Sequence, residues 1–323
     1  MEMETKEKCD NCFIPLPYKK AVVTGGAGFI GSHLCEELIK EGIEVISIDD
    51  YSAGYEKNIQ HLNEYDNFKA VNGDITEWWK LEKYFKDVDV IFHNAASKKN
   101  ICLKDPERDM DVNGKAVIKL LDLALKYKVK KFVHASTGSV YGEPKELPLT
   151  ENSPLEPCSY YGVSKLAGER YVNLYNKMHG LDTTILRYFH VYGERQESNE
   201  FGGVVSIFMR NMANKEQPII HGDGSQLRSF TYVKDVVKAN IMASYNPAMS
   251  GQVYNCASGI KVSIKELYDV ICGDTKPRYE DWLVGDIKDM EVSNDKIRPY
   301  VSFDTEWKDN IRRMINESST NRS

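Results

Sequence analysis

Tyr161 and Lys165 are the two residues whose types and spacing most directly indicate catalytic chemistry. They are four positions apart in a segment of helical period, so they share one face of the predicted helix. An ammonium beside a phenol stabilises the phenolate, so we expect Lys165 to lower the Tyr161 pKa from about 10 toward neutrality and create a general base. Tyr160 lacks this partner, because Ser164 stands four positions ahead of it. Such a pair alone is common on solvated helix surfaces, so its place in the fold has to support it.

Thr137 is a second candidate, because it follows an apolar run that predicts a buried strand. In an open α/β sheet, ligands bind at the carboxyl ends of the strands. A hydroxyl there can hydrogen-bond the substrate oxygen that gains and loses the proton. Ser136 and Ser139 are better explained as residues that cap a turn.

A glycine-rich loop, Thr24 to Gly31, comes directly after the first predicted strand and opens the first predicted helix. Gly25 permits the tight turn, Gly28 lets a pyrophosphate approach the backbone, and Gly31 lets the helix pack on the strand. The N–H groups at the start of that helix then face an anion. The glycine pattern alone is weak, but the strand before it and the helix after it favour a dinucleotide site over a structural turn.

Two adjacent acids, Asp49 and Asp50, end the second predicted strand, and Asp49 comes 24 residues after Gly25. In a dinucleotide fold, an acid here accepts hydrogen bonds from the adenosine ribose hydroxyls and repels a 2′-phosphate. No arginine occurs between Asp49 and the end of the following helix. The sequence therefore predicts NAD rather than NADP, against the alternative of a solvated turn.

The segments that position these residues alternate between short apolar runs rich in β-branched residues and stretches of helical period. This alternation predicts an α/β protein with a Rossmann-type, doubly wound parallel sheet. Helices are expected behind the glycine loop up to Gly42, from Pro106 through Leu125, and from Tyr160 to Met178. Apolar residues of the last two helices can pair between subunits as readily as within one, so we expect a homodimer. The predicted strands are 21–24, 45–48, 69–72, 90–92, 132–136 and 184–188.

The regular alternation fails after Tyr188, where glycines divide the chain into short pieces. We therefore predict a smaller, interleaved C-terminal lobe that faces the substrate. The expected division is an N-terminal tail over 1–17, an NAD-binding Rossmann domain over 18–188 to which 231–256 return, a substrate lobe from 189–230 and 257–309, and a polar C-terminal tail over 310–323.

Composition excludes several functional classes. The net charge of −6 provides no broad basic face, so no nucleic-acid partner is expected. No run approaches the roughly 20 apolar residues that span a bilayer, so no membrane partner is expected. Seven scattered cysteines favour a reducing, cytoplasmic compartment over a disulfide framework. Cys9 and Cys12 lack the second ligand pair of a structural zinc site, so no metal is expected.

Taken together, the motifs resemble those of the extended short-chain dehydrogenase/reductases, and within them the NAD-dependent nucleotide-sugar epimerase/dehydratase family. The resemblance covers roughly residues 20–295 and adds six motifs in family order to the glycine loop. They are Asp74-Ile75, His93 to Ala96, Ser136 to Gly142, Tyr161 to Lys165, Arg187 to Gly193 and Arg228 to Val233.

The resemblance implies a binding role for further residues. Arg228 matches an arginine that grips the diphosphate of a nucleotide sugar, and Gly203 with Val204 matches a turn near its base. The cofactor-binding residues implied are Gly25, Gly28, Phe29, Ile30, Gly31, Asp49, Asp50, Asp74, Ile75, Asn94, Ala95, Ala96, Lys98, Asn113, Tyr161, Lys165 and Tyr188. The substrate-binding residues implied are Lys99, Thr137, His190, Gly203, Val204 and Arg228.

Two positions depart from the family pattern. His190 stands where Asn is frequent beside the diphosphate, and Leu283 to Asp286 lacks the arginine that commonly precedes Gly-Asp. Lys99 or Lys288 would compensate for that missing charge. A UDP-sugar is still the favoured substrate, with the base and the sugar left open.

The resemblance alone does not decide the reaction, because epimerases, dehydratases, decarboxylases and reductases of the family all begin by oxidising a sugar carbon. The dehydratases carry an Asp-Glu pair after the threonine, where this sequence has Gly138-Ser139, and the decarboxylases usually have a Glu in place of Ser139. We therefore expect a UDP-hexose 4-epimerase that oxidises C4 transiently and returns the hydride. The alternatives are a 2- or 3,5-epimerase, a keto-sugar reductase and, more remotely, a non-catalytic NAD-binding sensor.

Overall fold

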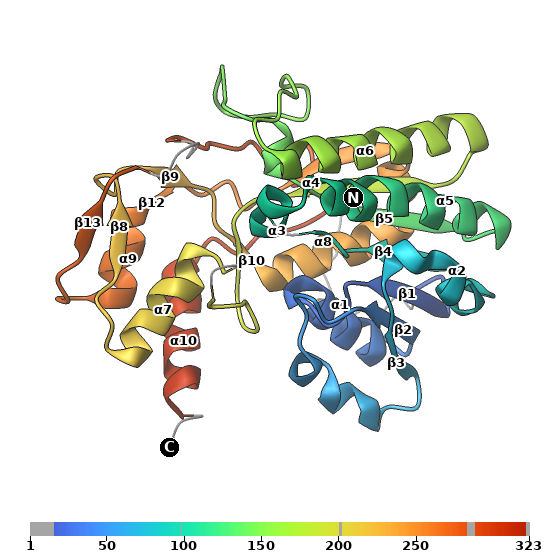
Figure 1. The fold of residues 1–323 in the computed structure, drawn as a ribbon, viewed down its shortest axis with the longest axis horizontal. Coiled ribbons are helices and arrows are strands. Elements are labelled where there is room, and N and C mark those ends of the chain that lie inside the picture. Colours follow the sequence, from blue (N-terminus) through green and yellow to red (C-terminus); the bar gives the residue numbers. More distant parts are fainter. Residues whose placement is uncertain (1–15, 98, 200–201, 283–287, 321–323) are drawn as a thin grey trace, which may run out of the picture.

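The computed structural model describes residues 16–97, 99–199, 202–282 and 288–320. Its centre is a seven-stranded parallel sheet in the order β11-β6-β5-β4-β1-β2-β3 (Figure 1). The strand order reverses between β1 and β4, which is where doubly wound sheets bind ligands at the strands' carboxyl ends. The predicted Rossmann-type α/β fold is confirmed. The strands are β1 Lys20–Thr24, β2 Glu44–Asp49, β3 Phe68–Asn72, β4 Val90–His93, β5 Lys131–Thr137, β6 Thr183–Tyr188 and β11 Gln252–Cys256.

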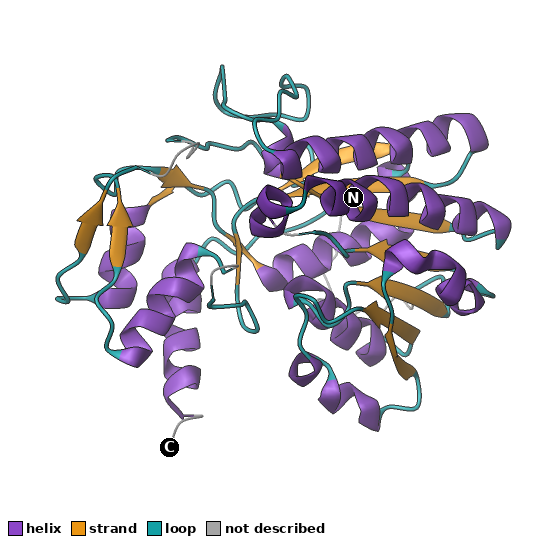
Figure 2. Cartoon of the chain, in the orientation of Figure 1, coloured by secondary structure: helices purple, strands orange, loops and turns teal. Residues whose placement is uncertain are grey.

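Helices cover both faces of the sheet, because successive side chains of a buried strand point to opposite faces (Figure 2). Val22 packs in the core beneath α5 and α6, whereas Ala21 and Val23 pack in the core beneath α1 and α8. None of the helices within the described ranges is both long and apolar enough to cross a bilayer. The helices of this body are α1 Phe29–Lys40, α2 Trp78–Leu81, α3 Lys99–Lys104, α4 Pro106–Met110, α5 Ala116–Lys126, α6 Tyr160–His179 and α8 Val233–Tyr245.

The six predicted strands are all present, and each is one residue longer at one or both ends. The helix predicted from Pro106 to Leu125 is not continuous. A π-helical turn, Asp111–Lys115, joins α4 to α5. Such turns are frequent at functional sites, and this one begins directly behind the cavity described below.

A smaller lobe is built on its own apolar core, to which Phe208, Leu267 and Ile311 contribute. Its helices are α7 Val204–Asn214, α9 Ile264–Cys272 and α10 Trp307–Thr320. Its strands form short pairs: β7 Val191–Tyr192 with β10 Thr231–Tyr232, β8 Ile219–His221 with β13 Arg278–Glu280, and β9 Leu227–Arg228 with β12 Val262–Ser263.

The prediction of a polar tail over 310–323 is wrong for the part that the structure describes, because α10 runs to Thr320. Trp307, Ile311 and Met314 lie on one face of this helix and are buried in the core of the second lobe. Asn310, the first residue of the supposed tail, is buried and donates a hydrogen bond to Asp304. The other residues of this segment are mostly polar, so its composition resembles a tail although its apolar residues recur at helical spacing.

Candidate active site

A cavity of about 720 Å³ lies at the carboxyl ends of the central strands and extends toward the second lobe at Gln196, Glu197 and Gly202. Its position is the one expected for a ligand at the reversal of strand order. Predicted cofactor residues make up much of its lining: Gly25, Gly28, Phe29, Ile30, Gly31, Asp49, Asp50, Asp74, Ile75, Asn94, Ala95, Ala96, Tyr161, Lys165 and Tyr188.

The glycine loop has room for backbone but not for side chains. Gly25 has a φ of 69°, and a Cβ there would lie 2.7 Å from the backbone nitrogen of Ala95. A Cβ at Gly31 would lie 2.1 Å from the carbonyl oxygen of Gly25. Helix α1 begins at Phe29 with no side-chain cap and no acid in its first turn, so its positive end is open to an anion. The loop therefore fits the pyrophosphate of a dinucleotide.

Asp49 and Asp50 differ in how they face the cavity. The Asp49 carboxylate is 8% exposed and accepts the backbone N–H groups of Ala27 and Tyr51, each at 2.9 Å. Burial raises its pKa, although these bonds oppose the shift. Asp50 is more open, and its Oδ1 accepts the N–H and hydroxyl of Ser52 at 3.0 and 2.6 Å. Asp49 thus also ties the end of β2 to the glycine loop.

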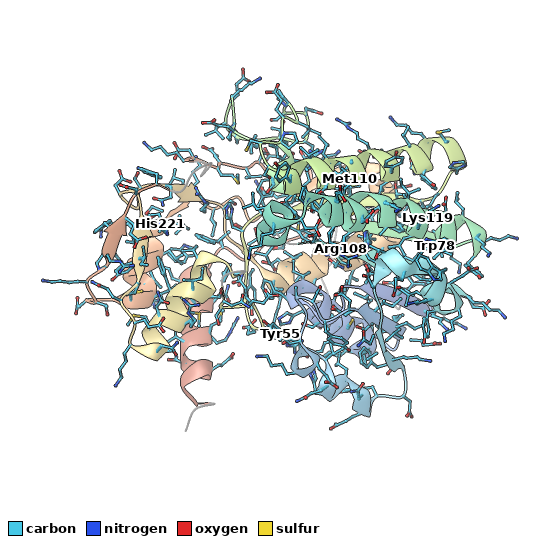
Figure 3. All side chains as sticks on the ribbon, in the orientation of Figure 1. Tyr55, Trp78, Arg108, Met110, Lys119 and His221 are labelled. Atoms are coloured by element: carbon cyan, nitrogen blue, oxygen red, sulfur yellow. The ribbon has the colours of Figure 1, made fainter. Side chains whose placement is uncertain are left out.

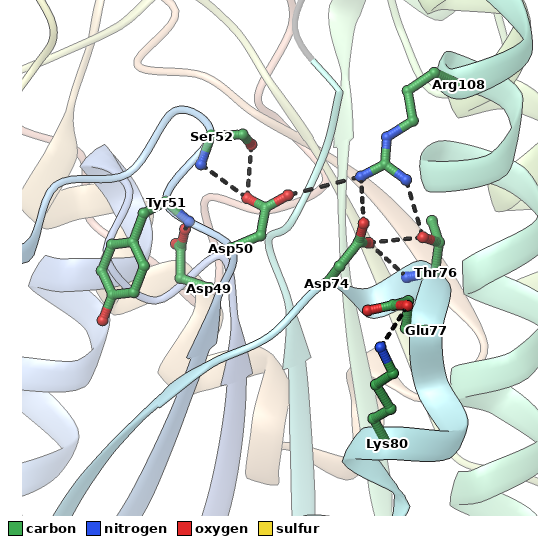
Figure 4. A network of polar contacts seen from close by, with 9 residues as sticks. All are labelled: Asp49, Asp50, Tyr51, Ser52, Asp74, Thr76, Glu77, Lys80 and Arg108. Atoms are coloured by element: carbon green, nitrogen blue, oxygen red, sulfur yellow. Dashed lines mark hydrogen bonds and ion pairs between the residues drawn. The ribbon is translucent and has the colours of Figure 1, made fainter.

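Arg108, which the sequence analysis missed, enters the same end of the cavity (Figures 3 and 4). Its guanidinium lies 2.7 Å from an Asp74 oxygen and 3.6 Å from an Asp50 oxygen, and it donates to the hydroxyl of Thr76 at 2.9 Å. Arginines near Asp49 in the sequence do not include Arg108, because Arg108 lies in α4, which follows β4, whereas Asp49 ends β2. Its position in a helix directly after the fourth-strand loop was the available signal.

Tyr161 lies in the first turn of α6, whose start is fixed by the Ser159 side chain accepting the N–H of Gly162 at 3.1 Å. Thr137 lies near enough to the Tyr161 hydroxyl to lower its pKa, so the structure brings two predicted catalytic residues close together. Burial of the hydroxyl among protein atoms raises its pKa to about 12; nearby Cys102 adds to this shift, and Thr137 opposes it.

Lys165 is buried beside this pair, and its Nζ donates to the carbonyl oxygen of Ala135 at 2.6 Å. Burial lowers the Lys165 pKa to about 8, with Glu169 and Asp109 opposing the shift. The expectation that Lys165 brings the Tyr161 pKa toward neutrality is wrong for the chain's own residues. The ammonium is directed at β5, and the cost of burying a phenolate outweighs the attraction across one helical turn.

Asn113 does not line the cavity, which corrects the cofactor contact predicted for it. It is fully buried in the π-helical turn, and its side-chain oxygen accepts the N–H of Ser97 at 3.0 Å. Its amide donates to Asp109 at 2.7 Å and to the hydroxyl of Ser164 at 3.1 Å. The sequence analysis also missed Asp109, which accepts the thiol of Cys102 at 2.7 Å. This network attaches the fourth-strand loop and α4 to the helix that carries Tyr161.

Four of the residues predicted to bind substrate, His190, Gly203, Val204 and Arg228, lie on the second-lobe side, and they do not line the 720 Å³ cavity. His190 has a φ of 38°, and burial lowers its pKa to about 3, with the positive charge of nearby Arg228 adding to the shift. Arg228 is 8% exposed and donates to the carbonyl oxygens of Leu227 and Lys288. Gly203 caps the start of α7, so Val204 is its first residue. Arg228 is thus close enough to His190 for its charge to lower the pKa of the imidazole.

Some predicted residues fall outside the described part of the chain: Lys98, the side chain of Lys99, Leu283 to Asp286, and the pair Cys9 and Cys12. Among the described residues, no three His, Cys, Asp or Glu side chains gather in a way that could hold a metal ion.

Comparison with known proteins identifies relatives across most of the chain. The model of the NAD dependent epimerase/dehydratase family matches residues 21–257. A putative UDP-glucose 4-epimerase of Methanocaldococcus jannaschii is 43% identical over 252 residues, which are 77% of this chain and 80% of the relative. The UDP-glucose 4-epimerase of Mycolicibacterium smegmatis is 35% identical over 88% of this chain and 93% of its own.

A solved structure agrees in fold over nearly the whole length. The UDP-N-acetylglucosamine 4-epimerase of Methanobrevibacter ruminantium, determined in complex with UDP-N-acetylmuramic acid, has a TM-score of 0.86 and 34% sequence identity. The match covers 94% of this chain and 99% of that protein. The chain therefore belongs to the NAD dependent epimerase/dehydratase family.

Proposed function

Because the chain belongs to the NAD dependent epimerase/dehydratase family, we propose that it is a UDP-sugar 4-epimerase. NAD is the cofactor of the family, and the side-chain-free glycine loop, the open start of α1 and the acids at the end of β2 fit it. The second lobe holds the nucleotide sugar, with Arg228 and His190 at the diphosphate. Uridine diphosphate is common to the names of the relatives compared, whereas their sugars differ.

In this proposal, Tyr161 takes the proton from the sugar C4 hydroxyl, and Thr137 holds that oxygen beside the phenol. Bound NAD would supply the hydride acceptor and a positive charge that favours the phenolate. Lys165 keeps its place by its bond to Ala135 and contributes a second positive charge behind Tyr161. After the 4-keto sugar presents its other face, Tyr161 returns the proton to the same oxygen.

The environment of Gly138 is the observation that favours epimerisation over dehydration. A Cβ at Gly138 would lie 2.4 Å from the ring of Phe189, which is itself buried. The Asp that family dehydratases carry at this point therefore has no room here. Ser139, the following residue, also provides no acid to expel water across C5 and C6.

Transfer of an isotope label tests this function. The enzyme is incubated with UDP-glucose deuterated at C4, and the products are followed by NMR and mass spectrometry. We expect the label at C4 of the inverted product, with no NADH accumulating beyond one equivalent per site. Solvent hydrogen at C4 would refute direct hydride return. Exchange at C3 or C5 with C4 unchanged would indicate a 3,5-epimerase, and continuous NADH production would indicate a dehydrogenase.

The homodimer is part of the proposal and is supported by the outer face of α6. Tyr160, Val163, Tyr171, Leu174 and Met178 form one stripe at helical spacing and are between 41% and 70% exposed. We expect light scattering to give the mass of a dimer and L174E to give a monomer that still binds NAD. An L174E variant that stays dimeric would place the interface elsewhere.

A cytoplasmic location is also proposed. It is supported by Cys35, Cys158, Cys256 and Cys272, which are free thiols and suit a reducing compartment.

A further inference from the structure

Arg108 lines the cavity near Asp49 and Asp50, at the end where the adenosine ribose of a dinucleotide would lie. Dinucleotide folds need an acid at the end of β2, but that need does not account for an arginine beside it. The Nη2 of Arg108 lies 2.7 Å from Asp74 and 3.6 Å from Asp50, at the ends of two neighbouring strands, β3 and β2 (Figure 4). Its Nη1 donates to Thr76 at 2.9 Å. About one third of the Arg108 side chain remains exposed, so the guanidinium can still contact a ligand.

The position of Arg108 is fixed by its own helix. Asp105 caps α4 by accepting the N–H of Arg108 at 2.9 Å, and Pro106 begins the helix. The side chain therefore starts from a defined turn and crosses to the acids from a different βα unit. Nη1 donates to Thr76 and Nη2 donates to Asp74, so the direction of the planar fork is set by two side-chain hydrogen bonds and by the longer contact of Nη2 with Asp50.

The three carboxylates near Arg108 differ in the groups from which they accept hydrogen bonds. Asp49 is committed to backbone N–H groups of the glycine loop and β2. Asp74 accepts the N–H and the hydroxyl of Thr76, both at 2.8 Å, as well as the 2.7 Å bond from Arg108. Asp50 accepts the N–H and the hydroxyl of Ser52 through Oδ1, and its Oδ2 makes only the longer 3.6 Å contact with Arg108. Among the contacts of the guanidinium, the one with Asp50 is therefore the one that a competing anion displaces most easily.

We propose that Arg108 and Asp50 together decide whether the site accepts a phosphorylated adenosine ribose. A nearby arginine is what receives a 2′-phosphate in dinucleotide folds, and the guanidinium fork matches phosphate oxygens. The Asp50 carboxylate lies beside Nη2 of the fork and repels the phosphate, so the site takes NAD. Where Asp50 is replaced by an uncharged side chain, the guanidinium binds the 2′-phosphate of NADP.

Cofactor exchange tests the proposal without turnover, so its failure and the failure of the 4-epimerase assignment are distinguishable. The full chain as purified is equilibrated with mixtures of NAD and NADP, and the nucleotides retained are quantified by mass spectrometry. We expect D50N to shift the retained ratio toward NADP by about 10-fold or more, because a charge-assisted phosphate contact replaces a repulsion. R108M alone should shift the ratio further toward NAD.

The double variant D50N/R108M decides the role of Arg108. The shift toward NADP should disappear there, and D50N/R108K should keep part of it, because charge remains without the fork. Lys80 provides the matched control, since it is a nearby exposed cation that pairs with Glu77 at 2.7 Å and does not line the cavity. K80M should leave the ratio unchanged. A D50N variant without a shift, or a shift that survives R108M, would overturn the proposal.

Discussion

Burial of the Tyr161 hydroxyl raises its pKa to about 12, and nearby Cys102 and Asp109 add to this shift. The chain alone therefore holds a phenol, not a phenolate, at neutral pH. In the proposed mechanism, the positive charge of bound NAD lowers this pKa, so we expect Tyr161 to act as a base only when the cofactor is bound.

Replacement of Tyr161 by Phe tests that role directly. Y161F keeps the ring that packs against the cavity wall, so we expect the fold and NAD binding to be retained. General-base catalysis typically contributes about 10²- to 10⁴-fold, so kcat should fall by that factor with KM little changed. Y160F is the control, because Tyr160 is 56% exposed on the outer face of α6. Full activity in Y161F would refute the assignment.

Lys165 predicts a pH dependence of stability. Its pKa is about 8 in the fold and about 10.4 in an unfolded chain, so between these values unfolding takes up a proton. Raising the pH through this window therefore favours the folded state. Urea unfolding should show the wild type gaining stability relative to K165M between about pH 8 and 10. K115M, at an exposed lysine, should run parallel to the wild type. A constant gap between wild type and K165M would contradict the buried-lysine assignment.

Helix α6 is fixed to the sheet by a buried ion pair one turn beyond Lys165. Glu169 is 1% exposed and accepts Arg187 through both oxygens, at 2.9 and 2.7 Å, and the hydroxyl of Ser136 at 2.5 Å. Arg187 also donates a hydrogen bond to the hydroxyl of Tyr141 at 2.8 Å. The contacts connect α6, β5 and β6 directly beneath the catalytic residues.

Loss of one partner in this pair leaves the other buried with its charge uncompensated. We expect E169Q to lower the free energy of unfolding by about 3 to 5 kcal/mol, as measured by denaturant titration. Glu156 provides the control, because its pair with Lys145 is exposed, and E156Q should cost less than about 1 kcal/mol. Equal losses of unfolding free energy in the two variants would mean that the buried Glu169–Arg187 pair contributes no more to stability than the exposed pair.

Elements with a strong local pattern could be predicted from the sequence to within a residue or two, and those that depend on distant contacts could not. The strands and α6 carry runs and periods long enough to be recognised locally. The π-helical turn at Asn113 depends on bonds to Ser97 and Ser164 on other elements. Arg108 reaches Asp50 only because β4, which precedes its helix, and β2 end at the same edge of the parallel sheet, with β1 between them. The candidate catalytic pair Tyr161 and Lys165 could be recognised in the sequence because a helix places positions four apart on one face.

At the scale of the whole molecule, the two lobes share contacts at the cofactor end of the cavity. Phe29 and Ile30, in the first turn of α1, line the cavity and also pack against the core of the second lobe. Arg195 pairs with Glu36 on α1, and the carbonyl oxygen of Glu194 lies 2.8 Å from the His33 ring. The lobe that is proposed to bind the sugar is therefore coupled to the loop that binds the pyrophosphate.

A substitution in α10 tests whether the two lobes unfold as one unit. Ile311 is 1% exposed in the second-lobe core, so I311A removes buried methyl groups and should lower the free energy of unfolding by about 2 to 5 kcal/mol. R312A, at the adjacent exposed position, should change it by no more than about 0.5 kcal/mol. If the lobes unfold as one unit, calorimetry of I311A will show a single transition at lower temperature, and added NAD will raise it. Two separated transitions, with NAD raising only the one that belongs to the Rossmann body, would show that the packing at Phe29 and Ile30 is too weak to couple the lobes.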